Sequence, residues 1–118
     1  MSRLKTAFVE MFGESPMVRV VDFFLMYSGF DYSKSQVARE TGVSRVTMEK
    51  IWGDLIRSGL IVKTRDMGRA GMYTLNVKNP RVRALVRFDL DISFDAIERD
   101  EKLAAGARVS HARASRAR

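Results

Sequence analysis

Apolar residues recur at helical spacing in the first half of the chain and again after residue 80, and an alternating segment separates the two regions. The run Met17 to Tyr27 is apolar over a wide arc, which predicts a central buried helix. Ser15-Pro16 supplies a capping hydroxyl and a proline suited to the first turn. Before it, a short apolar stripe ends at Gly13 and predicts a small helix, formed by Leu4, Ala7, Phe8, Met11 and Phe12.

The segment 36–59 contains two helical patterns separated by a sharp turn, which is typical of a helix-turn-helix. Gly42 suits the left-handed residue that ends the first helix, and Ser44 can cap the second. Ser33 and Gln36 stand three apart, as a capping box at the start of the first helix requires. The residues expected to face inward are Val37, Ala38 and Thr41 from the first helix and Met48, Ile51, Trp52, Leu55 and Ile56 from the second.

The outer front of the second helix then consists of side chains that can bind base edges in a DNA major groove. Arg and Lys can donate to guanine, Glu can accept from cytosine, and Val or the Thr methyl can contact thymine. A solvated helix face of mixed charge is the plain alternative. We interpret the helix as a recognition helix over residues 44–58, with major-groove candidates Ser44, Arg45, Val46, Thr47, Glu49 and Lys50. The first turn of the preceding helix, with Ser33, Lys34 and Ser35, is the candidate for a DNA phosphate.

After Gly59 the period changes from helical to alternating, which predicts a strand near residues 60–65. Turn-forming residues fill 66–71, and a second strand is expected over 72–77, so the segment predicts a β-hairpin with a flexible tip. A hairpin directly after a recognition helix is a wing. Lys63, Arg65 and Arg69 are its candidate DNA contacts, with the tip at 65–71 on the minor groove or the backbone. A surface hairpin with solubilising arginines is the alternative.

Asn79-Pro80 predicts the start of a long helix that runs to about Leu103. This helix has more apolar residues than contact with one small domain needs. We therefore expect a dimer surface with Leu85, Phe88, Ile92 and Ala96, although the helix could instead fold back entirely on its own domain. Residues 89–101 are strongly acidic and should point away from DNA. The tail 104–118 is basic and poor in apolar groups, which predicts disorder, and it could contact phosphates or the acidic helix of a neighbouring copy.

Composition narrows the function further. The chain has 118 residues, a net charge of +7, one histidine and no cysteine. One domain with extensions fits this length. The positive charge suits a polyanion without separating DNA, RNA and an anionic membrane. The lack of cysteine argues against disulfides and zinc fingers, and we expect no metal and no cofactor. Without a long apolar run or a signal peptide, a soluble cytoplasmic protein associated with the nucleoid and not with a membrane is expected.

The ordered series of motifs resembles the winged helix-turn-helix transcription regulators, in the broad group of MarR-like and ArsR-like proteins and especially the small archaeal, archaeal-virus or plasmid regulators. The similarity spans about residues 12–82 through FGESPMVRVVDFF, DYSKSQVARETGVSR, IWGDLIRSGLIVKTRDMGRAGMYTLN and NPRV. It implies a DNA-binding dimer with residues 44–50 in the major groove and 65–71 as the wing. The cysteine pairs of metal-sensing members and clear effector-cleft residues have no counterpart, so a small-molecule effector is not identified.

The predicted fold class is mainly α with a small β-hairpin. The expected parts are an N-terminal helical extension (1–14), a winged helix-turn-helix domain (15–78), a C-terminal dimerisation helix (79–103) and a basic tail (104–118). The predicted function is a homodimeric, sequence-specific regulator of transcription that binds double-stranded DNA. An enzyme is disfavoured, since the single histidine, His111, lies in the tail. The main alternative is a partition or chromatin adaptor that spreads along DNA. Protein-binding and RNA-binding winged helices are further alternatives.

Overall fold

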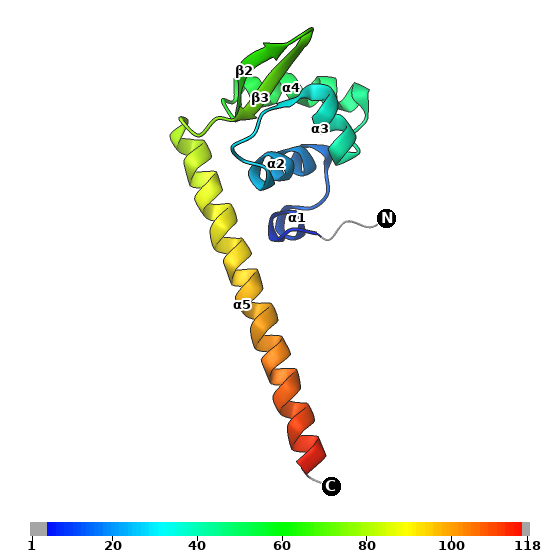
Figure 1. Ribbon diagram of the computed structural model, residues 1–118, viewed down its shortest axis with the longest axis vertical. Helices are drawn as coiled ribbons and strands as arrows, with labels where there is room; N and C mark the ends of the chain where they lie inside the picture. The colour runs from blue at the N-terminus through cyan, green and yellow to red at the C-terminus, as the bar shows by residue number, and fades with distance from the viewer. Residues whose placement is uncertain (1–4, 117–118) are drawn as a thin grey trace.

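The computed structural model describes residues 5–116, with side chains as far as residue 106. A compact body holds the first seven elements, and the last helix leaves it as a long rod (Figure 1). Leu4, part of the predicted first stripe, lies outside the described residues. The elements in order are α1 Ala7–Phe12, α2 Pro16–Met26, β1 Tyr32–Ser33, α3 Lys34–Thr41, α4 Arg45–Arg57, β2 Ile61–Met67, β3 Ala70–Leu75 and α5 Pro80–Arg116.

The core lies where α2, α3 and α4 pack together beneath the sheet (Figure 1). Phe24 of the predicted central helix is 1% exposed, and its ring lies 6.0 Å from that of Trp52 in α4. Trp52 also meets Tyr73 of β3 edge to face at 5.2 Å, so one aromatic column joins α2, α4 and the sheet. The predicted inward positions are buried or half-buried except Ile56, which is 41% exposed.

The capping predictions for the helix-turn-helix are confirmed. Ser33 accepts a hydrogen bond from the Gln36 amide, and the Gln36 side chain accepts one from the Ser33 amide. Gly42 ends α3 in the left-handed region with φ of 70°. Ser44 then caps α4 by accepting from the amide of Thr47. Two local signals therefore fix the turn and the direction in which α4 leaves it.

The sheet has three antiparallel strands in the order β1-β3-β2, one more than the predicted hairpin. The additional strand is β1, a two-residue segment directly before α3 that pairs Tyr32 with Tyr73. The predicted turn over residues 66–71 is too long, because strand pairing continues to Met67 opposite Ala70. The turn is only Gly68-Arg69, and Gly68 has the positive φ, 60°, that a type II′ hairpin turn requires at its first position.

Helix α5 begins at Pro80 as predicted, but it continues past the predicted end at Leu103 to Arg116. The backbone of residues 104–116, predicted to be disordered, is helical. Alanine and arginine are strong helix formers, and extending an existing helix needs no new nucleus. Helix α1 packs between α2 and the first part of α5, and the rest of α5 projects from the body (Figure 1). Among the described residues, no helix is both long and apolar enough to cross a membrane.

Candidate nucleic-acid interface

The outer face of α4 presents several of the predicted major-groove residues to solvent. Arg45 and Lys50 are exposed, and Val46 has 68% of its surface accessible although it is apolar. Within residues 5–106, neither Arg45 nor Lys50 takes part in an ion pair or a side-chain hydrogen bond. The first two turns of α4 therefore offer two available cations on either side of an apolar side chain.

Ser44 and Thr47 lie at the start of the same helix and bond to each other. The Ser44 hydroxyl donates to Thr47 Oγ1 at 3.0 Å and accepts from the Thr47 amide at 3.2 Å. Both were predicted to contact bases. Their hydrogen bonds show a capping role, which leaves the Thr47 methyl group as the part suited to an apolar contact, and base contact by either residue stays a prediction.

Glu49 faces α3 rather than standing alone on the α4 surface. Its carboxylate lies 2.7 Å from the ammonium of Lys34, the residue that opens α3. A shallow pocket between the two helices is lined by both residues together with Ser35, Arg45 and other neighbours. The structure thus joins a predicted base contact, Glu49, to a predicted phosphate contact, Lys34, in one ion pair.

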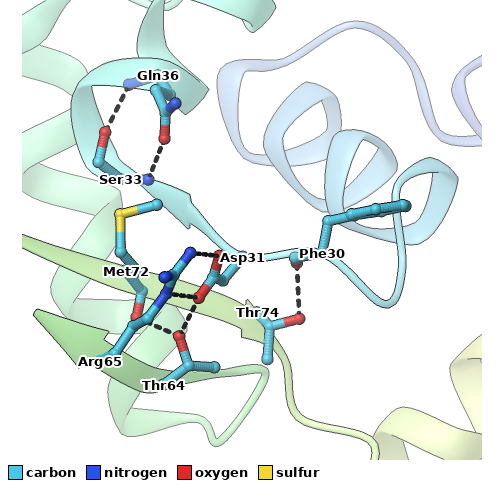
Figure 2. Close-up of polar contacts among 8 residues, drawn as sticks. All are labelled: Phe30, Asp31, Ser33, Gln36, Thr64, Arg65, Met72 and Thr74. Carbon is cyan, nitrogen blue, oxygen red and sulfur yellow. Dashed lines mark hydrogen bonds and ion pairs between the residues drawn. The ribbon is translucent and has the colours of Figure 1, made fainter. Parts of the chain in front are cut away.

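Two of the three predicted wing cations are also paired. Lys63 lies 2.5 Å from Asp66 on the same strand, and this carboxylate raises the pKa of the lysine. Arg65 reaches Asp31 through Nε at 2.9 Å and through a second nitrogen at 3.2 Å (Figure 2). Arg69, at the hairpin turn, is exposed and has no ion pair among the residues that the structure describes. Arg69 is therefore the wing cation that remains available.

Asp31 is a member of this ion-pair network that the sequence did not identify. It lies in the loop after α2, and Thr64 donates to the same carboxylate at 2.5 Å (Figure 2). Arg65, and after it Thr64, hold the pKa of Asp31 below its ordinary value. The contact depends on a bulge at Thr64, between Lys63 and Arg65, and on β1 pairing with β3. No local sequence pattern predicts a contact between two residues that are 34 positions apart.

Helix α5 has two apolar stripes, an inner one that faces the rest of the chain and an outer one that faces solvent. The predicted dimer residues belong mostly to the inner stripe. Leu85 and Ile92 pack against the core of the same chain, and Ala96 is half-buried. Phe88 is 38% exposed and lies 6.0 Å from the ring of Phe12 in α1. A second stripe, spaced four and three residues apart, is at least half exposed and comprises Leu90, Phe94 and Ile97. We call these three residues the outer stripe.

Solved structures similar to this chain include transcription regulators. MepR, which regulates the Staphylococcus aureus multidrug efflux pump MepA, is 14% identical with a TM-score of 0.55, over 91% of this chain and 83% of MepR. A point mutant of ZitR from Lactococcus lactis is 12% identical with a TM-score of 0.56, over 90% and 65%. A predicted DNA-binding transcriptional regulator from E. coli is 24% identical with a TM-score of 0.50, over 66% and 78%. The chain has a winged helix-turn-helix fold.

In this winged helix-turn-helix, α3 and α4 form the helix pair and β2 and β3 form the wing. No protein-family model and no curated protein matches the sequence. The solved neighbours include winged-helix regulators of the MarR type, in agreement with the group to which the sequence motifs are similar. At these identities the likeness establishes the fold, and the archaeal affinity stays a prediction.

Proposed function

We propose that this chain is a sequence-specific regulator of transcription that binds double-stranded DNA as a homodimer. The observation that supports it best is the outer face of α4, where Arg45, Val46 and Lys50 are exposed and the two cations are unpaired among the described residues. This helix follows a capped tight turn and precedes a hairpin whose tip holds another available arginine, Arg69. Such an arrangement suits a recognition helix in the major groove with a wing beside it.

The N-terminus of α3 supplies the proposed backbone contact. Ser35 is exposed in its first turn, where amide groups without helical partners favour a phosphate. In the free protein, Ser33 caps α3 and Lys34 is paired with Glu49, so both side chains already have partners within the chain. Phosphate contacts of this kind position a protein on the duplex without reading its sequence.

Dimerisation through α5 completes the proposal. The outer stripe leaves Leu90, Phe94 and Ile97 at least half exposed on a helix that projects from the body. Covering these side chains with a second copy removes apolar surface from water. Because the predicted set of Leu85, Phe88, Ile92 and Ala96 largely faces the same chain, we place the centre of the dimer surface at the outer stripe. Two recognition helices would then meet half-sites about one DNA turn, roughly 34–36 Å, apart.

Selection of purified protein on random duplexes, followed by footprinting at two salt concentrations, tests the function. We expect a short inverted repeat with a footprint of fixed length. Its half-site spacing gives the distance between the two recognition helices. A footprint that lengthens as protein is added would replace the operator model with a spreading adaptor. Absence of duplex binding would refute the proposal.

A further inference from the structure

Among the described residues, carboxylates of the same chain are paired with three of the six cations predicted to contact DNA. Lys34 is paired with Glu49 at 2.7 Å, Lys63 with Asp66 at 2.5 Å, and Arg65 with Asp31 at 2.9 Å. Within the described part of the chain, the cations of these elements that have no such partner include Arg45, Lys50 and Arg69. The paired cations come from the start of α3 and the body of the wing, and the available ones come from the front of α4 and the wing tip.

Of the three ion pairs, the Asp31–Arg65 pair has the most hydrogen bonds to its carboxylate. The Asp31 side chain is 19% exposed, whereas its Arg65 partner is 58% exposed. Both guanidinium contacts and the Thr64 hydroxyl converge on one carboxylate, and Thr64 Oγ1 also lies 3.2 Å from the carbonyl oxygen of Met72 (Figure 2). Thr74 fixes the same loop by donating to the carbonyl of Phe30 at 2.8 Å. The carboxylate is therefore held in place before any ligand arrives.

Exposed ion pairs of this type contribute little to the stability of a fold. They have a larger effect on the binding of a polyanion. A cation that binds a phosphate releases a condensed counterion, and this release drives association with DNA of any sequence. A cation already paired with a carboxylate must give up that partner first, and the freed carboxylate then repels the phosphate. Each pair therefore weakens the non-specific attraction of the protein to DNA.

We propose that Asp31, Glu49 and Asp66 are specificity-determining residues that withhold Arg65, Lys34 and Lys63 from non-specific phosphate contact. The inference rests on the proposed DNA-binding function. It assigns Glu49 a role other than accepting from cytosine, and it makes Arg65 a wing-positioning residue in the free protein. Discrimination between sequences then depends on Arg45, Lys50 and Arg69, the cations that need no prior release.

The test uses the full chain with Asp31→Asn, Glu49→Gln and Asp66→Asn, singly and together. Binding to a random-sequence duplex is measured by fluorescence anisotropy between 50 and about 200 mM KCl. We expect tighter random-duplex binding and a salt slope that steepens by up to about 0.9 for each released cation. Affinity for the selected site should rise less, so the ratio of specific to non-specific binding should fall. Asp95→Asn is the matched control, since it breaks the Asp95–Arg99 pair on α5 with the same change in net charge.

A double-mutant comparison isolates the Asp31 pair. Arg65→Gln should leave the salt slope nearly unchanged in the wild-type background and flatten it in the Asp31→Asn background. Unchanged slopes in all three carboxylate variants, or an equal steepening in Asp95→Asn, would overturn the inference while leaving DNA binding intact. Failure of the wild type to bind any duplex would instead refute the proposed function. Circular dichroism on each variant verifies that the fold is retained.

Discussion

Replacing Phe94 with serine tests whether the outer stripe of α5 joins two copies of the chain. Phe94 is 63% exposed at the centre of this stripe, between Leu90 and Ile97. Serine removes the aromatic ring from a surface that makes few contacts with its own domain. The fold should therefore survive while association weakens.

The size of the effect follows from the exposed fraction. Burying a whole phenylalanine contributes about 1.5–3 kcal/mol, so covering the exposed 63% of Phe94 contributes ~1–2 kcal/mol per copy. A two-fold interface contains the residue from both copies, so the loss is about 2–4 kcal/mol per dimer. At 1.4 kcal/mol per factor of ten, the dimer dissociation constant should rise roughly 30- to 700-fold.

Sedimentation equilibrium over a range of protein concentrations measures that constant. Phe30→Ser is the matched control, because Phe30 is 67% exposed on the loop after α2 and lies outside the stripe. We expect the control to dimerise like the wild type. Equal dissociation constants for the Phe94 and Phe30 variants would refute the proposed surface, and a wild type that is monomeric at high micromolar concentration would refute the dimer.

Three further predictions concern DNA contacts and pH. Arg45→Ala or Lys50→Ala should reduce the binding free energy by about 1–3 kcal/mol at the selected site and by less on random DNA. Equal losses on the selected site and on random DNA would show that the residue contacts a phosphate and not a base. Arg69→Ala should weaken binding and flatten the salt slope by about 0.9, whereas an unchanged slope would place the wing away from DNA. Burial, and then repulsion by Asp22, raises the pKa of Asp89, so its charge opposes folding above that pKa. Asp89→Asn should therefore raise Tm at pH 7, and this gain should shrink as the pH falls through the raised pKa and be gone below the ordinary value of about 4, which calorimetry against pH can measure.

Local chemistry explains which parts of the fold the sequence could predict. Ser33, Gln36, Gly42 and Ser44 each have a capping or turn role that depends on residues no more than three or four positions away. The same holds for Asn79-Pro80 at the start of α5. Predictions of this kind succeeded because neither a distant partner nor a sheet register enters them.

The features that were missed or wrongly predicted depend on pairing between distant residues or on residue propensities that favour different structures. The Asp31 to Arg65 contact needs the β1-β3-β2 order, which the two-residue strand β1 does not announce. The inner and outer stripes of α5 could not be assigned from periodicity, because both are apolar and only the packing of α1 distinguishes them. In the tail, low hydrophobicity suggested disorder, while the helix propensity of alanine and arginine favoured continuation of α5.

Asn79 connects α4, the proposed recognition helix, to α5, the proposed dimer helix. Its side-chain amide donates to the carbonyl of Gly59, just after α4, at 3.1 Å, and its side-chain oxygen accepts from the amide of Arg81 at 3.0 Å. Gly59 has φ of 76°, and a Cβ there would lie 2.8 Å from the Asn79 nitrogen, so glycine is needed both for the backbone and for this approach. Asn79 thereby links the start of α5 to the residue that follows α4. A dimer formed through α5 would consequently set the spacing and angle of the two recognition helices, which links the choice of operator to the packing of a helix that need not touch DNA.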